Sequence, residues 1–329
     1  MADMIDTLPQ SFLMRRPTMD DLEAVHRLFE ICEIAELGGP EITLDDLRTL
    51  WIMSTFNLES DAWLVTSAEG QPVGYADMEQ REHARIFTLV RVHPDYVGRG
   101  VGEYLLEQAE AWARRQIPLA APEVRVTLSS FTGGSYEEAK RLFEGQGFKE
   151  IRRSWRMEID MSDMPPAPEW PENVTVRTFQ PGDERAVFET VDEAFQDHFG
   201  HMRGDFEEWK HWTVERETFD PSLWFLAFDG EKLAGCSLCS YEGELGWVNT
   251  LAVLRPWRHK GLGMALLLHS FGEFYRRGRH TVGLGVDSQN LTGATRLYER
   301  AGMHVARIYI AYEKELRAGV ELSTQTITV

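Results

Sequence analysis

The feature of this 329-residue chain that most constrains its fold is an internal repeat. Tryptophans and glycines recur at a constant spacing of 161 positions, and the two copies start with a spacing one residue larger (Arg15 and Arg177). Near the ends, AKRLFEGQGF matches ATRLYERAGM with a spacing of 155, which implies a shorter loop in the second copy. A repeat of this length indicates a duplicated domain, not a solenoid. The pairs at spacing 161 are Trp51 and Trp212, Trp63 and Trp224, Gly74 and Gly235, Gly100 and Gly261, and Gly102 and Gly263.

A proline-rich stretch separates the two copies. SDMPPAPEWPEN, at positions 162–173, contains four prolines, which block helices and central strands and favour extended backbone. We therefore expect residues 164–173 to be a linker. It would join an N-terminal domain of residues 1–163 to a C-terminal domain of residues 174–329, and the chain is long enough for two hydrophobic cores.

Both copies show the same order of predicted elements. A short strand and two helical stretches are followed by a hairpin, another strand, a glycine turn and a long amphipathic helix. A strand, a helix and a final strand complete each copy, so the pattern predicts a mixed α/β fold. The clearest elements are helices at 20–32, 183–195 and 291–301, and strands at 86–92, 247–253, 281–286 and 305–312.

Composition excludes several classes of protein. The formal net charge of −19 argues against general binding to nucleic acid, and no run of about 18 apolar residues is present to span a membrane. The first residues do not form a secretory signal, and Cys32, Cys236 and Cys239 make a poor disulfide framework, so the cytoplasm is expected. Strand alternation places Cys236 and Cys239 on opposite faces, so we expect no metal site there.

The second copy carries an anion-binding pattern between a strand and a helix. The stretch WRHKGLGMA has the form R-x-x-G-x-G, with Arg258, Gly261 and Gly263. Glycines allow close approach to the backbone, and the first N–H groups of a helix have no partner within it. Backbone amides from about His259 to Met264 would therefore suit a pyrophosphate. The pattern matches neither a P-loop nor a Rossmann fingerprint.

These residues resemble the acetyl-CoA-binding motif of the GNAT N-acetyltransferases. The resemblance covers nearly the whole chain as two tandem GNAT domains. It implies an α/β (α+β mixed) fold in which each domain has a mostly antiparallel sheet flanked by helices. The matching positions are Val253, Pro256, Arg258, Gly261, Gly263, Asn290, Ala294, Tyr298 and Gly302 in the second copy, and Val92, Pro94, Val97, Gly98, Gly100 and Gly102 in the first.

The resemblance implies an enzyme that transfers acetyl from acetyl-CoA to an amine by direct attack on the thioester. Tyr298 would protonate, or at least stabilise, the departing thiolate, and Asn290 would hydrogen bond the pantetheine arm. Backbone groups of Leu251 and Val253 would pair with the pantetheine and thioester. Positioning the amine and polarising the carbonyl would supply much of the barrier reduction. The residues implied to bind the pyrophosphate are Arg258, His259, Lys260, Gly261, Leu262, Gly263 and Met264.

The general base is where the sequence departs from the family pattern. Many members place a glutamate on the strand before the glycine turn, where this chain has Trp247. Glu244 could act through a water held near Asn249, although an exposed turn residue is an equally good interpretation. His198 and His201 follow the first helix of the second copy, where the family lines its acceptor site. With Asn249 they are candidates for that site, and a polar surface loop is the alternative for each.

The two copies are not equivalent at the implied site. The first copy has Val97 at the position of Arg258 and Phe143 at that of Tyr298, and it shows no counterpart of Asn290. Since phenylalanine cannot donate a proton, the C-terminal domain is expected to be catalytic. The N-terminal domain would support it, and it could also hold a second CoA through Val92, Gly98, Arg99, Gly100 and Gly102.

A small-molecule amine is the expected acceptor, because a partner domain can enclose it. Nucleic acid and membrane are not expected partners, and the chain is expected to be a monomer or homodimer. Three alternatives remain open at this point: a noncatalytic acyl-CoA-binding or regulatory protein, a transferase of a longer acyl group, and a transferase that acts on a protein amine.

Overall fold

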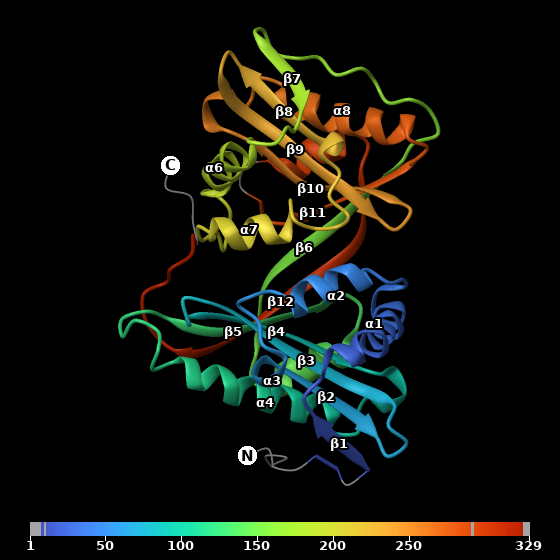
Figure 1. The fold of residues 1–329 in the computed structure, drawn as a ribbon, viewed down its shortest axis with the longest axis vertical. Helices are drawn as coiled ribbons and strands as arrows, with labels where there is room; N and C mark the ends of the chain where they lie inside the picture. Colours follow the sequence, from blue (N-terminus) through green and yellow to red (C-terminus); the bar gives the residue numbers. More distant parts are fainter. Residues whose placement is uncertain (1–7, 10, 291–292, 325–329) are drawn as a thin grey trace. The chain divides into compact units, whose positions relative to one another are not determined.

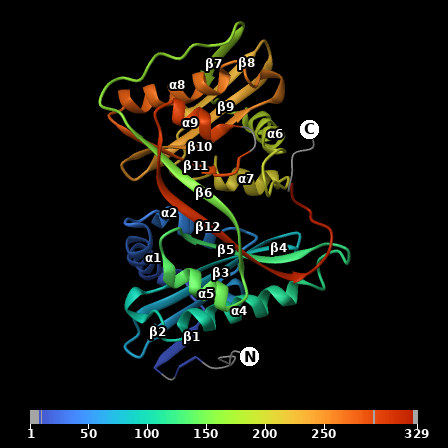
Figure 2. The same ribbon diagram turned by 180° about the vertical axis from the view of Figure 1, so that it is seen from behind.

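The computed structural model describes residues 8–9, 11–290 and 293–324, which divide into two compact units. Unit 1 contains the described residues up to Arg153 together with Ile308–Leu322. Unit 2 contains Ser154–Arg307 together with Ser323 and Thr324. Figures 1 and 2 show that both contain a sheet with helices against it, which confirms the mixed α/β fold with a mostly antiparallel sheet. Among the described residues, no helix is both long and apolar enough to cross a bilayer.

The first half of the chain forms its elements in the expected order. They are β1 (Phe12–Arg15), η1 (Met19–Asp21), α1 (Leu22–Leu37), α2 (Leu44–Trp51), α3 (Leu58–Asp61), β2 (Ala62–Ser67), β3 (Pro72–Arg81), β4 (Arg85–Val92), η2 (Pro94–Tyr96), α4 (Val101–Gln116), β5 (Val126–Gly133), α5 (Glu137–Gly145) and β6 (Lys149–Asp160).

The second half repeats this order after a stretch between β6 and β7 for which the structure assigns no helix or strand. Its elements are β7 (Val174–Thr178), α6 (Glu184–Phe195), α7 (Phe206–Trp212), η3 (Pro221–Leu223), β8 (Trp224–Asp229), β9 (Lys232–Glu242), β10 (Leu245–Val253), η4 (Arg255–Trp257), α8 (Leu262–Arg276), β11 (Thr281–Asp287), α9 (Ala294–Arg300) and β12 (His304–Arg317).

The units differ from the expected contiguous domains because the halves exchange their last strands. In unit 1 the strand order is β1-β2-β3-β4-β5-β12, and β12 pairs antiparallel with β5. In unit 2 the order is β6-β11-β10-β9-β8-β7, and β6 pairs antiparallel with β11 over Ser154–Asp160. The boundaries expected at residues 163 and 174 therefore do not coincide with those of the compact units.

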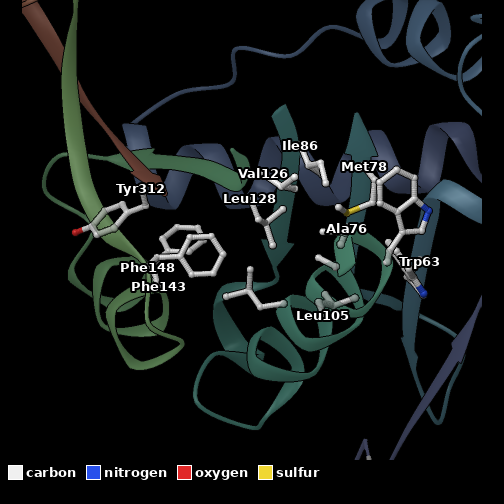
Figure 3. Packing of buried hydrophobic residues seen from close by; sticks show 14 of the residues in the cluster. Trp63, Ala76, Met78, Ile86, Leu105, Val126, Leu128, Phe143, Phe148 and Tyr312 are labelled. Atoms are coloured by element: carbon white, nitrogen blue, oxygen red, sulfur yellow. The ribbon is translucent and has the colours of Figure 1, made fainter. Parts of the chain in front are cut away.

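Apolar residues at alternating strand positions build a core beneath the helices. In unit 1, Trp63, Met78 and Ile86 from the sheet pack with Leu105 of α4 and Phe143 of α5 (Figure 3). In unit 2 the sheet has a core on each face, because alternate residues contribute to different clusters. Cys236 belongs to the cluster that includes residues of α6, and Cys239 to the cluster that includes residues of α8 and α9, so they lie on opposite faces as predicted.

In each unit the two parallel strands at the centre of the sheet separate after a short pairing. The register between β4 and β5 covers Arg85–Phe87 with Thr127–Ser129, and that between β10 and β11 covers Gly246–Val248 with Val282–Leu284. Beyond these pairs the described strands diverge toward their carboxyl ends. This divergence, called the split below, places unpaired strand edges next to the glycine turn that follows β4 or β10.

Candidate active site

The split in unit 2 opens into a cavity of about 510 Å³. Its walls come from the end of α6, the end of β10, the glycine turn, the first turn of α8, and α9. The structure therefore brings together many of the residues predicted for the cofactor and for catalysis. The lining residues are Ala194, Phe195, His198, Leu251, Ala252, Val253, Arg258, His259, Gly261, Gly263, Met264, Gly293, Ala294, Arg296, Leu297, Tyr298 and Arg300.

The glycine turn bends into the start of α8 through two left-handed residues. Gly261 has φ +87° and caps the helix, and His259 has φ +61°, which is uncommon for a residue with a side chain. The N–H of Ala265 donates to Gly261 O, so the amides of Leu262, Gly263 and Met264 come before the first donor of the helix and have no acceptor within α8. These amides and the helix dipole form a site for an anion at the cavity wall.

The side chain of Arg258 has structural partners on three sides. Its Nε donates to Val253 O at 3.1 Å, its Nη2 to Ala194 O at 2.9 Å, and its Nη1 to Asp197 Oδ2 at 2.7 Å. Arg255 also pairs with Asp197, and the two arginines lower the pKa of this carboxyl to about 2. Arg258 lines the cavity, but its guanidinium is used mainly to join the glycine turn to the end of α6.

The edge of β10 that faces the split carries the backbone groups of Leu251 and Val253. Leu254 N–H donates to Ala234 O on β9 at 3.0 Å. Hydrogen-bonding direction alternates along an antiparallel ladder, so Leu254 and Ala252 point toward β9 while Leu251 and Val253 point the other way. Since β11 has already diverged there, this edge can hydrogen bond an extended ligand.

Tyr298 of α9 lies at the wall of the same cavity and is 8% exposed. Burial raises the pKa of its phenol to about 12. The phenol is therefore protonated at neutral pH and can donate a proton to an anion that forms inside the cavity. The structure thus places Tyr298 in the same cavity as the predicted cofactor-binding residues.

Glu244 does not lie at the cavity. It occupies the turn between β9 and β10, where its side chain is 93% exposed and pairs with Arg279. It precedes Leu251 by seven residues on the strand, a separation of roughly 20 Å at about 3.3 Å per residue. Neither direct proton transfer nor transfer through one water can cover that distance. The position of the family glutamate, Trp247, packs across Gly283 of β11, where a Cβ would come within 2.4 Å of the ring.

Other predicted residues also lie outside the cavity lining. Asn249 is the extra residue of a β-bulge in β10, where its Oδ1 accepts from Ser240 Oγ at 2.8 Å. His201 faces Asp192 at 3.3 Å, and Lys260 is exposed to solvent. Asn290 Oδ1 accepts from Ala294 N at 3.3 Å and so caps α9.

Two cations of α9 in the lining were not predicted. Arg296 and Arg300 are four residues apart and therefore share one face of the helix, next to the glycine turn. This spacing on a short helix after the motif was the sequence signal that could have identified them. Both add positive charge to a cavity wall that already presents helix amides.

Unit 1 has a related cavity of about 370 Å³ at its own split. Val92, Gly98 and Gly102 of the predicted second CoA site line it, whereas Arg99 and Gly100 do not. Glu103 also lines it, in the first turn of α4, where unit 2 has Met264. A carboxylate at this place competes with a bound anion for the helix amides.

Charged side chains of Arg91 and Glu36 line the split of unit 1. Arg91 stands at the position of Ala252 and is 4% exposed, with Glu33 and Glu36 at 3.9 and 3.8 Å. Glu36 also accepts hydrogen bonds from Thr132 Oγ1 and Gly133 N on β5. Phe143 takes the place of Tyr298 and stacks on Tyr312. Unit 1 therefore has no phenol at the place of Tyr298, and its cavity is smaller than that of unit 2.

Comparison with known proteins identifies both halves. Residues 59–150 match the acetyltransferase (GNAT) domain, and residues 185–303 match the acetyltransferase (GNAT) family. A mycothiol acetyltransferase of Thermobispora bispora is 33% identical over 68% of this chain and 74% of its own length. One of Streptomyces scabiei is 29% identical over 94% and 97%. The crystal structure of a GCN5-related N-acetyltransferase from Sphaerobacter thermophilus has a TM-score of 0.82 and 39% identity over 97% and 100%.

The chain belongs to the GNAT family of acetyltransferases, as a tandem of two GNAT domains. It is an acyltransferase that uses acetyl-CoA as the acyl donor and an amine as the acceptor. A tandem GNAT protein from the clavulanic acid pathway, 16% identical with a TM-score of 0.70, shares the fold. The resemblance seen in the sequence is confirmed.

Proposed function

We propose that unit 2 is the catalytic unit and that acetyl-CoA binds in its cavity. The observation that supports this most is that the glycine turn, the open edge of β10 and Tyr298 line one cavity. The first-turn amides of α8 would bind the pyrophosphate, with Arg296 and Arg300 on the neighbouring wall. The pantetheine would lie along Leu251 and Val253, which brings the thioester to the inner end of the split.

Tyr298 would act as the general acid in this arrangement. Acetyl-CoA supplies an activated acyl group whose thiolate leaves when the amine attacks. Tyr298 is protonated at neutral pH because burial raises its pKa to about 12, and its phenol can donate to the sulfur as negative charge develops there. The walls of the cavity hold the reactants in place and limit access of water.

For the acceptor we propose a small molecule with a primary amine. The relatives named mycothiol acetyltransferase support a small thiol-containing acceptor of the mycothiol type. The cytoplasm is the proposed compartment, in line with three cysteines that are all free and buried. A monomer or homodimer remains our expectation for the assembly.

The test is CoA release with acetyl-CoA and a panel of small primary amines, with lysine peptides as the protein-like comparison. We expect turnover with small amines and little with peptides. Gly261→Glu should abolish the CoA affinity of unit 2, because a carboxylate would stand at the anion site in a residue that needs positive φ. Gly243→Glu, at a positive-φ glycine of the β9–β10 turn, is the matched control and should leave CoA affinity unchanged. Normal CoA binding by Gly261→Glu would move the site elsewhere.

For unit 1 we propose a supporting role, in which any CoA binds more weakly than in unit 2. Glu103 in the first turn of α4 and the Arg91–Glu36 contacts in the split support this proposal. In the Gly261→Glu variant only unit 1 should still bind CoA, so a titration of this variant with CoA measures the affinity of unit 1. An affinity as tight as that of the wild-type protein would contradict the proposal.

A further inference from the structure

The internal repeat assigns His198 of unit 2 to the position that Glu36 holds in unit 1. The starts of the two halves match with a spacing of 162, the difference between Arg15 and Arg177. Each of these arginines forms a two-pronged ion pair with the aspartate six residues further along. The same spacing relates Glu36 to His198. Two residues after each of them stands a glycine with positive φ, Gly38 with 81° and Gly200 with 77°.

Glu36 shows what a side chain at this position reaches in unit 1. Its Oε1 accepts hydrogen bonds from Thr132 Oγ1 at 2.7 Å and from Gly133 N at 2.6 Å. Both residues lie beyond Ser129, the last residue of β5 that pairs with β4. The side chain therefore enters the split from the helix side.

The residue of unit 2 that corresponds to Gly133 is Asp287. Gln80 and Tyr241 are equivalent residues of the two hairpins, and they pair with Ile86 of β4 and Gly246 of β10. Ile86 and Gly246 pair in turn with Leu128 of β5 and Val282 of β11, which sets a spacing of 154 for these last two strands. The same spacing takes Gly133, the last residue of β5, to Asp287, the last residue of β11. Where unit 1 has the Glu36 carboxylate on the backbone amide of Gly133, unit 2 thus has an imidazole and the residue Asp287.

His198 also lines the cavity that contains Tyr298 and Leu251. Its ring packs against Phe195 with 4.2 Å between centroids, and its backbone N–H donates to Phe195 O at 2.8 Å. The imidazole therefore lies at the cavity wall, on the α6 side of the sheet. Tyr298 approaches from α9, on the other side.

Burial and the nearby Arg258 lower the pKa of His198 and so favour its neutral form. Burial lowers its pKa most, and Arg258 on the glycine turn lowers it further. Asp287 on β11 and Asp197 on its own loop raise the pKa in part, and His201 on the same loop lowers it. The result is an imidazole that can accept a proton, next to a carboxylate that stabilises the protonated form.

We propose that His198 is the general base of the acetyl transfer and that Asp287 is its positioning residue, an inference that rests on the proposed function of unit 2. The amine nitrogen forms the C–N bond as the C–S bond of the thioester breaks. His198 accepts the proton that the amine loses, and Tyr298 gives its phenolic proton to the sulfur. Solvent then removes a proton from His198 and returns one to Tyr298, so the balance is amine and acetyl-CoA to amide and CoA.

The test compares the pH profile of kcat/KM for wild type, His198→Gln and Asp287→Asn with one acceptor amine. We expect His198→Gln to lower kcat/KM about 100-fold. The fall of kcat/KM at acidic pH that results from protonation of His198 should also disappear from its pH profile. Asp287→Asn removes the charge that raises the pKa of His198, so its acidic limb should move to lower pH. The ammonium of the acceptor titrates identically in all variants and does not obscure these differences.

His269→Gln is the matched control, because His269 is a second half-buried histidine of unit 2 whose ring contacts Phe225 outside the cavity. It should keep the wild-type profile, and added imidazole should partly restore activity to His198→Ala. His198→Gln with activity within about threefold of wild type and an unchanged profile overturns the inference, as does an acidic limb of Asp287→Asn that moves upward. A wild type that acetylates no amine would instead contradict the proposed function itself.

Discussion

Arg258 and Asp197 connect the glycine turn to the loop after α6, with 2.7 Å between Nη1 and Oδ2. The same guanidinium bonds the carbonyl of Val253 at the end of β10. Unit 1 has Val97 in place of Arg258, and there Cys32 Sγ donates to Val92 O at 3.2 Å. The arginine therefore fixes the shape of the turn in unit 2 by contacts that unit 1 does not have.

Arg258→Lys tests whether shape or charge matters at this position. A lysine keeps the positive charge, but its ammonium group cannot reproduce the hydrogen bonds that the guanidinium makes to Val253, Ala194 and Asp197. We expect CoA affinity to fall about tenfold, similar to Arg258→Gln, because the turn loses hydrogen bonds to charged groups. Calorimetric titration with CoA measures the effect. If lysine preserves affinity while glutamine loses it, Arg258 acts through charge on the ligand.

Asp197→Asn should change the dependence of stability on pH. The arginines lower the pKa of Asp197 in the folded state to about 2, below its usual value near 4. Its contribution is thus present above about pH 4 and is lost as the pH falls through 2. We expect the variant to melt a few degrees lower than wild type at pH 7, with the difference shrinking toward pH 2. Thermal unfolding at both ends of this range provides the check, and an equal difference at pH 7 and pH 2 would rule out the ion pair as the cause.

The repeat, the element order and the glycine turn were predictable because local patterns determine them. The exchange of the last strands was not predictable from the sequence. The residue pattern of β6 and of β12 specifies a strand, but it does not specify which of two similar sheet edges each strand joins. The helix expected at 291–301 begins at Ala294 in the structure, after Gly293 with φ +81°, and residues 291–292 lie outside the described part of the chain.

A one-residue difference between the units was hidden by the constant spacing. The bulge at Asn249 adds a residue to β10, whereas the hairpin before it has two turn residues in place of the three between β3 and β4. These changes cancel in the sequence count. For the same reason, Glu244 looked closer to the site than it is, since its position within the hairpin depends on turn length and on the bulge.

Exchanging the equivalent residues Met264 and Glu103 tests why the two units should differ in their affinity for an anionic ligand. Met264→Glu places a carboxylate in the first turn of α8, as Glu103 does in α4. We expect CoA affinity of unit 2 to fall at least tenfold because the carboxylate competes for the helix amides. Glu103→Met should increase CoA binding by unit 1, measured in the Gly261→Glu background. Met264→Gln is the uncharged control, and a loss of affinity equal to that of Met264→Glu would assign the effect to shape.

The most direct test of the central claim is the acetyl-transfer rate of Tyr298→Phe, measured by CoA release with saturating acetyl-CoA and an accepted amine. The account predicts a loss of about 100-fold or more in kcat, with CoA affinity unchanged, because only the proton donor is removed. Phe143→Tyr, the matched change in unit 1, should leave the rate unchanged. Wild-type turnover by Tyr298→Phe would contradict the assignment of unit 2 chemistry to this phenol.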